Sequence, residues 1–396
     1  MKIKSTSYLN LILLVASLSA VQHSVAQIPC GPVITPPVTL NVNWPQFQFD
    51  AKRSGCNPYE QILSTTTVGN LTLDWQYATP YPVHGGSQAV VNGVLYSDSY
   101  AVKVASGELV WDNGIVAGSA PAVVNGVEYI GGAVPDVNLY AINISDGTTR
   151  WSFPTGSQVT SSPTVVNGVV YFGSWDSYVY AVNAATGALV WKHATGGSVE
   201  SSPAVTNGVV YVGSDDKNMY ALDAGTGAVL WKFAASGRVA DALSVANGMV
   251  YFGACFPDVN FYAVNAGTGV LVWKSPLGSL GANENSPAVA DGVVYIPDED
   301  GEVFAFNAST GASLWQYSTG EYIQSSPVIA NGVLYLSLQF HLVALNAATG
   351  SNLWSPDGTA LGGSPTVVNG TVYFASEVPG NPYPTGMIWA FHLPGK

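Results

Sequence analysis

Alternating apolar and polar residues recur along this chain in a unit of about forty residues. In the copy at residues 161–191, SSPTVVNGVVYFGSWDSYVYAVNAATGALVW, four short apolar runs are separated by turn residues. Asn167-Gly168 suits the two positive φ angles of a two-residue hairpin turn, and Gly187 lies in a second turn. The unit therefore predicts four short antiparallel strands.

Eight copies of the unit follow one another. The first turn of each copy is Asn-Gly or, once, Asp-Gly: Asn92-Gly93, Asn125-Gly126, Asn167-Gly168, Asn207-Gly208, Asn247-Gly248, Asp291-Gly292, Asn331-Gly332 and Asn369-Gly370. The eighth copy ends after its third strand, at residues 388–391, whereas residues 71–75 have the pattern of a fourth strand with none before it. Pairing these two segments would close a ring and leave no open seam. The sequence predicts an all-β, eight-bladed propeller of four-stranded antiparallel blades at residues 71–396.

The motif SSPxVxNGxVYxGS…YAxNAxTGxxxW resembles the repeat of the pyrroloquinoline-quinone (PQQ) type propellers. The preceding segment, from Trp44-Pro-Gln-Phe to Val68-Gly-Asn-Leu71, is similar to the lead-in of quinoprotein dehydrogenases and their relatives. This family includes quinone-dependent alcohol dehydrogenases, non-enzymatic scaffolds of outer-membrane protein assembly, and sensor ectodomains. The resemblance implies a fold in which the tryptophans stack between blades, and it does not imply one function.

The N-terminal residues have the features of a secretory signal. Lys2 and Lys4 precede an apolar run at residues 9–21, and small residues end at Ala26. We expect residues 1–26 to be cleaved, and the mature protein to be secreted or periplasmic with no transmembrane segment. Residues 27–70 are expected to form an extended leader and lead-in, of which residues 44–70 pack across one face of the propeller.

Three cysteines, Cys30, Cys56 and Cys255, leave at least one unpaired thiol in a monomer. A Cys30–Cys56 disulfide is favoured, because both residues flank the irregular lead-in and export favours oxidation. A Cys56–Cys255 disulfide is the alternative. If it is not bridged, Cys255 is expected to be a small buried residue.

The formal charge is −13, from 12 basic and 25 acidic residues. No basic stripe is present to neutralise phosphates, so the sequence argues against nucleic acid as a partner. We expect a monomer whose partner is a protein or a small polar ligand.

In the PQQ-type family the quinone site lies at the mouth of the central channel, where the first strand of each blade begins. Departures from the repeat place carboxylates and amides there in the fourth to seventh copies, and a loop of the third copy could cap the site. The candidate ligand-binding residues are Glu200, Arg238, Asp241, Asn283, Glu284, Asn285, Glu321 and Gln324, with Trp175 and Asp176 on the capping loop. Converging carboxylates and amides suit a hard cation such as calcium.

Simpler interpretations of the same residues remain open. Arg238 and Asp241 could form a local ion pair on a solvated rim, and Trp175 could pack against neighbouring loops.

The resemblance offers two functions. We favour a binding or scaffold module without catalytic activity, because the chain lacks the adjacent cysteine pair and the large insertions of the quinoprotein dehydrogenases. The alternative is a PQQ- and calcium-dependent dehydrogenase of alcohols or sugars. In that case Glu200 and Asn285 would help to hold the metal, and Asp241 would be the catalytic base.

Overall fold

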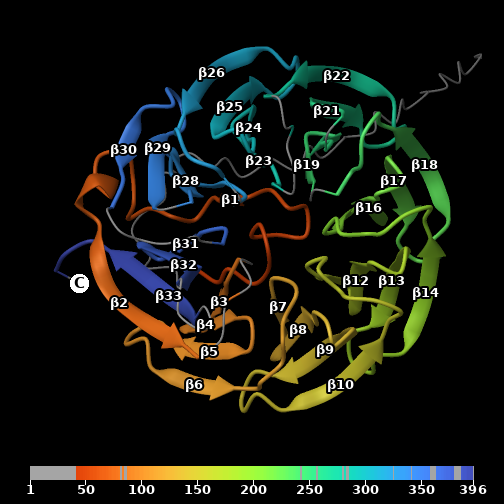
Figure 1. Cartoon of the computed structure of the whole chain (residues 1–396), viewed down its shortest axis with the longest axis horizontal. Coiled ribbons are helices and arrows are strands. Elements are labelled where there is room, and N and C mark those ends of the chain that lie inside the picture. The colour runs from red at the N-terminus through yellow and green to blue at the C-terminus, as the bar shows by residue number, and fades with distance from the viewer. Residues whose placement is uncertain are drawn as a thin grey trace, which may run out of the picture.

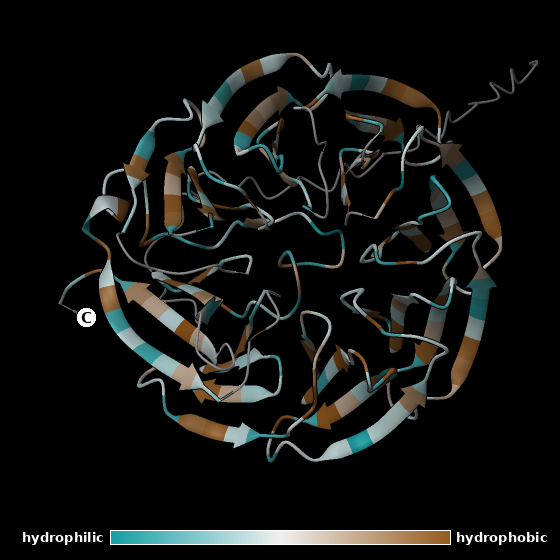
Figure 2. Ribbon diagram, in the orientation of Figure 1, coloured by the Kyte–Doolittle hydropathy of each residue, from teal (hydrophilic) through white to brown (hydrophobic). Residues whose placement is uncertain are grey.

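The protein is a ring of eight β-sheets around a central axis, which confirms the predicted propeller (Figure 1). This computed structural model describes residues 42–80, 83, 87–240, 243–255, 257–278, 281, 285–323, 325–339, 341–356, 363–378 and 385–395. Hydrophobic residues alternate with polar ones along the strands of the blades (Figure 2). Within the described ranges, no helix is long and apolar enough to cross a membrane.

The first four blades each contain four consecutive strands. These are β3 (Ala89–Val91), β4 (Val94–Ser97), β5 (Tyr100–Lys103) and β6 (Leu109–Asp112) in blade 1; β7 (Ala122–Val124), β8 (Val127–Gly131), β9 (Asn138–Asn143) and β10 (Thr149–Pro154) in blade 2; β11 (Thr164–Val166), β12 (Val169–Ser174), β13 (Tyr178–Asn183) and β14 (Leu189–Ala194) in blade 3; and β15 (Ala204–Thr206), β16 (Val209–Gly213), β17 (Asn218–Asp223) and β18 (Val229–Ala234) in blade 4.

The remaining blades follow the same plan, with one strand added to blade 7 and one borrowed by blade 8. They are β19 (Ser244–Ala246), β20 (Met249–Gly253), β21 (Asn260–Asn265) and β22 (Leu271–Pro276) in blade 5; β23 (Ala288–Ala290), β24 (Val293–Pro297), β25 (Glu302–Asn307) and β26 (Ser313–Ser318) in blade 6; β1 (Cys56–Asn57), β27 (Val328–Ala330), β28 (Val333–Ser337), β29 (Leu342–Asn346) and β30 (Asn352–Trp354) in blade 7; and β31 (Thr366–Val368), β32 (Thr371–Val378), β33 (Thr385–His392) and β2 (Thr72–Thr79) in blade 8. A short 3₁₀ helix, η1 (Val68–Asn70), precedes β2.

The ring closes through the strand that the sequence assigned to the eighth blade. β2 pairs antiparallel with β33, and Figure 1 shows the orange β2 beside the blue β33. The turn prediction is also confirmed, since the eight Asn or Asp residues have φ of 47–54° and the glycines that follow have φ of 73–79°. Asparagine and aspartate tolerate this left-handed region better than other residues with a Cβ.

Each blade packs on the next through a tryptophan that covers a glycine. Trp75 donates its indole N–H to the Val104 carbonyl at 2.8 Å, and a Cβ added to Gly107 would lie 2.7 Å from the Trp75 ring. The same tryptophan-on-glycine packing occurs at Trp111/Gly147, Trp151/Gly187, Trp191/Gly227, Trp231/Gly269, Trp273/Gly311 and Trp315/Gly350. The predicted stacking of tryptophans between blades is therefore confirmed.

The sequence predicts that residues 44–70 pack across one face of the propeller. In the structure, residues 44–57 of this lead-in form a plug at the centre of the ring. It makes a hydrogen bond to the inner strand of every blade, at Val90, Val123, Val165, Val205, Val245, Val289, Ile329 and Val367. Figure 1 shows this orange-red segment crossing the middle of the ring. One short segment thus contacts all eight blades.

The plug closes the end of the channel that carries the Asn-Gly turns. Val42 exchanges two hydrogen bonds with the side chain of Asn369, in the turn of blade 8. Further along, the Leu63 carbonyl accepts from Asn331 in the turn of blade 7. The segment therefore enters and leaves the ring at this end, and the opposite end of the channel has the plug as its floor.

Arg53 fixes the plug to the blades. Its side chain is fully buried and donates to the carbonyls of Phe47, Ser162, Pro163 and Pro203, at 2.7–3.2 Å, and to Thr164 Oγ1 at 2.6 Å. Burial lowers the pKa of the guanidinium to about 9 and Asp50 opposes this change, so Arg53 is charged at neutral pH.

The described cysteines exclude one of the two disulfide hypotheses. Cys56 is in a disulfide, whereas Cys255 is a buried thiol. The Cys56–Cys255 alternative is therefore wrong. Cys30 lies outside the described residues, together with the segment assigned to the signal, and the Cys30–Cys56 pair stays a prediction.

One carboxylate is buried between blades 1 and 2. Glu128 on β8 is fully buried beside the apolar cluster of Ile130 and Ile142, and neither of its carboxylate oxygens has a hydrogen-bond partner. Burial, with a smaller contribution from Asp98, raises the pKa of Glu128 well above its ordinary value. The other blades have valine or leucine at this position: Leu95, Val170, Val210, Val250, Val294, Leu334 and Val372.

We expect Glu128→Val to stabilise the protein by about 2 kcal/mol at neutral pH, because a buried polar group without a partner costs about 1–3 kcal/mol. The unfolded state releases the Glu128 proton near pH 4.3 and the folded state retains it to higher pH, so stability should fall by at most about 1.4 kcal/mol per pH unit as the pH rises above 4.3. Chemical denaturation from pH 4 to 8 measures this slope, which Glu128→Val should reduce. Glu108→Val, at an exposed turn, is the control. Equal slopes for the wild type and Glu128→Val would contradict the prediction.

Candidate functional site

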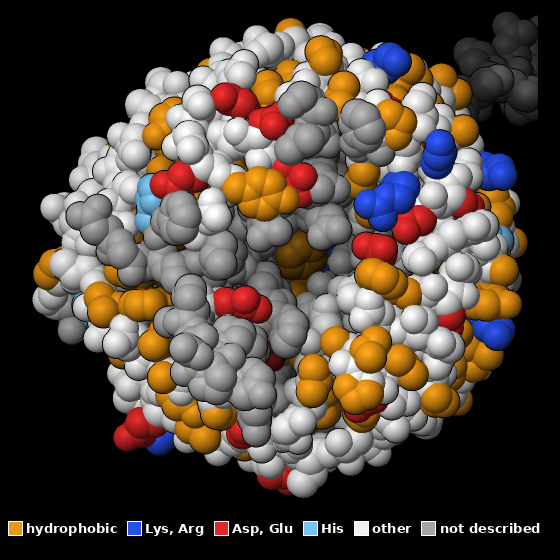
Figure 3. Space-filling view, in the orientation of Figure 1, with side chains coloured by type: hydrophobic (Ala, Val, Ile, Leu, Met, Phe, Trp, Pro, Cys, Tyr) orange, Lys and Arg blue, Asp and Glu red, His pale blue; other side chains and the backbone are white. Residues whose placement is uncertain are grey.

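The open mouth of the channel lies at the end opposite the Asn-Gly turns. Two kinds of loop surround it: the interblade loops, which join the fourth strand of one blade to the first strand of the next, and the mid-blade loops, which join the second and third strands. Figure 3 shows the ring hollowed at its centre, with acidic and basic side chains beside the hollow. The candidate residues from the sequence come from these loops.

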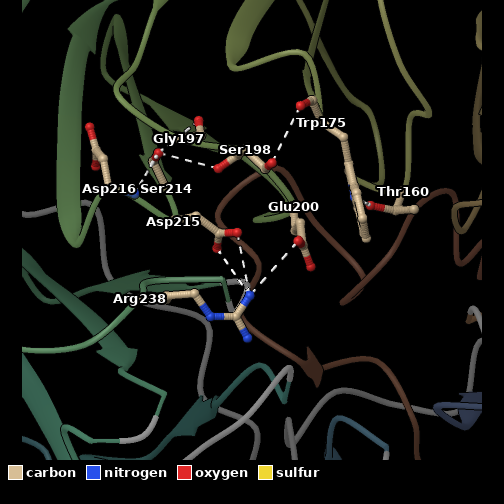
Figure 4. A network of polar contacts seen from close by, with 9 residues as sticks. All are labelled: Thr160, Trp175, Gly197, Ser198, Glu200, Ser214, Asp215, Asp216 and Arg238. Carbon is tan, nitrogen blue, oxygen red and sulfur yellow. Dashed lines mark hydrogen bonds and ion pairs between the residues drawn. The ribbon is translucent and has the colours of Figure 1, made fainter.

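A guanidinium lies between two carboxylates at one side of the mouth (Figure 4). Arg238, in the interblade loop between β18 and β19, has its Nη1 atom 3.3 Å from Asp215 Oδ2 and 4.0 Å from Glu200 Oε1. Asp215 is in the mid-blade loop of blade 4, and Glu200 is in the interblade loop before that blade. We call Glu200, Asp215 and Arg238 the charged triad.

The charged triad is half-buried rather than fully solvated. The side chains of Glu200 and Asp215 are 15% and 20% exposed, and that of Arg238 is 43% exposed. Burial works against the charge of Arg238, but Asp215 and, more weakly, Glu200 hold the pKa of the guanidinium above its ordinary value. With two carboxylates around one guanidinium, the formal charge of the triad is −1.

Trp175 presents an exposed indole in blade 3, beside the charged triad. Its ring is held in place, because Nε1 donates to Thr160 Oγ1 at 2.8 Å. The backbone of Trp175 donates to the Gln158 carbonyl at 3.1 Å and accepts from Ser198 Oγ at 3.3 Å. In Figure 4, Glu200 lies between the indole and Arg238.

Asp176, the second residue of the predicted cap, holds loops together. One of its carboxylate oxygens accepts from the backbone N–H of Gly156 at 2.7 Å and from the Tyr180 hydroxyl at 2.7 Å. Asp216 repeats these contacts in blade 4 with Gly196 and Tyr220. Asp176 is therefore part of a repeated link between an interblade loop and a mid-blade loop.

Two other candidates contact residues outside the charged triad. Asn285 is fully buried and donates from Nδ2 to the Ile323 carbonyl at 3.1 Å, while its Oδ1 has no partner among the described residues. Glu321 is in the interblade loop before blade 7, and its Oε1 atom lies 3.2 Å from Nδ1 of His341. Asp241, Asn283, Glu284 and Gln324 lie outside the described residues, so their roles stay predictions.

The described residues alone do not form the predicted calcium site, which stays a prediction because Asp241, Asn283 and Glu284 lie outside them. No three His, Cys, Asp or Glu side chains in this part of the chain converge to hold a metal ion. Glu200, the first proposed ligand, has the fixed positive charge of Arg238 at 4.0 Å, which would repel a cation bound to the same carboxylate.

Sequence reasoning missed Asp215 and expected Arg238 to pair with Asp241 if it formed a local ion pair. A usable signal was present in the repeat: Ser214-Asp215-Asp216 of blade 4 aligns with Ser174-Trp175-Asp176 of blade 3. The tryptophan already marked this position as facing the mouth.

Comparison with known proteins places the chain among the PQQ-like propellers. A family model described as "Outer membrane protein assembly factor BamB" matches residues 96–177 and 175–393, which is most of the chain. No curated protein matches the chain in sequence.

Solved structures with this fold have different activities. A quinohemoprotein alcohol dehydrogenase from Pseudomonas putida is 17% identical with a TM-score of 0.78, over 94% of this chain and 83% of its own. BamB from Moraxella catarrhalis is 19% identical with a TM-score of 0.68, over 81% of this chain and 99% of its own. A computationally designed protein reaches a TM-score of 0.66 at 16% identity, over 82% of this chain and 99% of its own. These similarities show the fold alone, and the family match shows that the chain belongs to the BamB-type family of PQQ-like repeat propellers.

Proposed function

We propose that this protein is a binding or scaffold propeller without catalytic activity, which acts in the cell envelope or outside the cell as a monomer after removal of residues 1–26. Its binding surface is the open mouth at blades 3 to 5. The observation that carries the proposal is the charged triad, in which loops of blades 4 and 5 hold Arg238 between two carboxylates at the mouth. The description of the family model as an assembly factor agrees with a binding role.

The floor of the mouth supports the same function. Because the plug is bonded to the inner strands of all eight blades, the loops around the mouth stand on a rigid support. A rigid surface loses little conformational entropy when a ligand binds. The chain therefore offers a preorganised polar surface.

Photocrosslinking at the mouth tests this function in cells that export the protein. With p-benzoylphenylalanine in place of Ser198, we expect a discrete adduct that is lost when Arg238→Met is added. The same photoreactive residue in place of Ala185, in an exposed turn of blade 3 at the other end of the channel, is the control. An adduct pattern at Ser198 that is absent, or that does not depend on Arg238, would contradict binding at the mouth.

Measurements on the purified protein test the dehydrogenase alternative. Purified protein mixed with calcium and PQQ should leave the quinone absorbance unchanged and should not reduce a dye with alcohols or sugars. Tight quinone binding that Glu200→Gln or Asp241→Asn abolishes would instead overturn the scaffold proposal.

A further inference from the structure

The exposed indole at the mouth is specific to one blade. Trp175 is 41% exposed, whereas the tryptophans of the blade interfaces each cover a glycine of the next blade. The hydrogen bond from Nε1 to Thr160 turns the polar edge of the indole toward the protein, so the face is what remains for a ligand. A fixed aromatic face favours a flat apolar surface, such as the C–H face of a ring.

The charged triad discriminates against charged ligands. An anion would approach two carboxylates whose only described counter-charge is one guanidinium, in a chain with a formal charge of −13. A cation would be attracted by the net charge of the triad, but Arg238 already lies between the two carboxylates that would bind it. A wholly apolar ligand would remove three charged groups from water without replacing their hydrogen bonds, which is costly.

A neutral ligand rich in hydroxyls fits this pattern of donors and acceptors. Carboxylate oxygens of Glu200 and Asp215 accept hydrogen bonds from hydroxyls. The described side-chain contacts of Arg238 are made by Nη1, and the N–H groups on Nε and Nη2 can donate to a hydroxyl oxygen. Hydrogen bonds to these ionised groups are stronger than those between neutral partners.

Building on the proposed function, we infer that the mouth at blades 3 to 5 binds a neutral saccharide. A sugar ring stacks its C–H face on Trp175, and its hydroxyls bond to Glu200, Asp215 and Arg238. Figure 4 shows these groups on neighbouring loops, with Glu200 between the indole and the guanidinium. The ligand class thus follows from the two kinds of surface that meet here.

Isothermal titration with purified saccharides tests the inference. The probes are maltotriose, cellotriose and triacetylchitotriose, with trigalacturonate as an acidic counterpart. We expect at least one neutral trisaccharide to bind, and trigalacturonate to bind at least about 10-fold more weakly than that one. Trp175→Ala and Arg238→Met should each weaken the neutral ligand by about 10-fold or more, which corresponds to about 1.4 kcal/mol.

A matched variant separates the role of Arg238 in the site from a general loss of charge. Lys232→Met removes one positive charge from an exposed position on β18, away from the mouth, and should leave the affinity unchanged. Thermal melting of every variant verifies folding.

Three results would overturn the inference: no binding of any neutral probe, tighter binding of trigalacturonate, or binding that neither site variant affects. If any one of these results is found while the Arg238-dependent adduct at Ser198 persists, the saccharide inference is wrong and the proposed binding function stands. If the adduct is also absent, the binding function itself fails.

Discussion

Arg53→Met is expected to destabilise the propeller by about 3–5 kcal/mol. Methionine is of similar length but cannot donate, so the carbonyls of Ser162 and Pro163 would lose their buried donor. The Thr164 hydroxyl would lose the donor to its oxygen, and the Pro203 carbonyl would keep only the bond from Thr164. Each buried acceptor left without a partner costs about 1–3 kcal/mol, although local rearrangement recovers part of this. Denaturant unfolding monitored by circular dichroism measures the loss.

The plug makes this effect larger than that of an ordinary buried residue. Arg53 bonds to the starts of the inner strands of blades 3 and 4, so its loss should also loosen the floor of the mouth. Arg150→Met, at an exposed position on β10, is the control and should change stability little. If the two variants unfold at the same denaturant concentration, Arg53 does not fix the plug.

Trp75→Ala is expected to cost about 3–5 kcal/mol, as large aromatic truncations do. Trp75 lies on the strand that closes the ring, covers Gly107 of blade 1 and donates to the Val104 carbonyl. The change therefore leaves a cavity and weakens the junction between blade 8 and blade 1. Because β2 is held in blade 8 by pairing with β33, a weakened junction should also make unfolding less cooperative.

Trp175→Ala is the matched control, since it removes the same side chain from an exposed loop position. We expect it to change the unfolding midpoint only slightly. Calorimetry of both variants gives the midpoint and the ratio of the calorimetric to the van't Hoff enthalpy. Trp75→Ala with the midpoint and cooperativity of Trp175→Ala would show that ring closure contributes little to stability.

The sequence by itself determined the blade count, the turns and the closing of the ring. These features depend on local properties that every copy repeats. Asn167-Gly168 adopts positive φ values because of its own backbone preferences. Each four-residue spacing of glycine and tryptophan places the glycine in a turn and the tryptophan on the strand that follows. The pattern of turns and strands is a weak signal in one copy, but it is a strong one here because the copies repeat it.

Contacts between different copies were decided only by the tertiary structure. Arg238 contacts Asp215 and Glu200 because two interblade loops and one mid-blade loop meet at the mouth, a meeting that spacing along the chain does not reveal. The path of the plug and the bonds of Arg53 likewise depend on where eight inner strands converge on the axis. Glu128 was visible in the sequence as a departure from valine, but its complete burial follows from the packing of blade 2 against blade 1. Sequence periodicity specifies which face of a strand is apolar, whereas the partner of a charged or polar side chain is set by distances between segments that only the closed ring brings together.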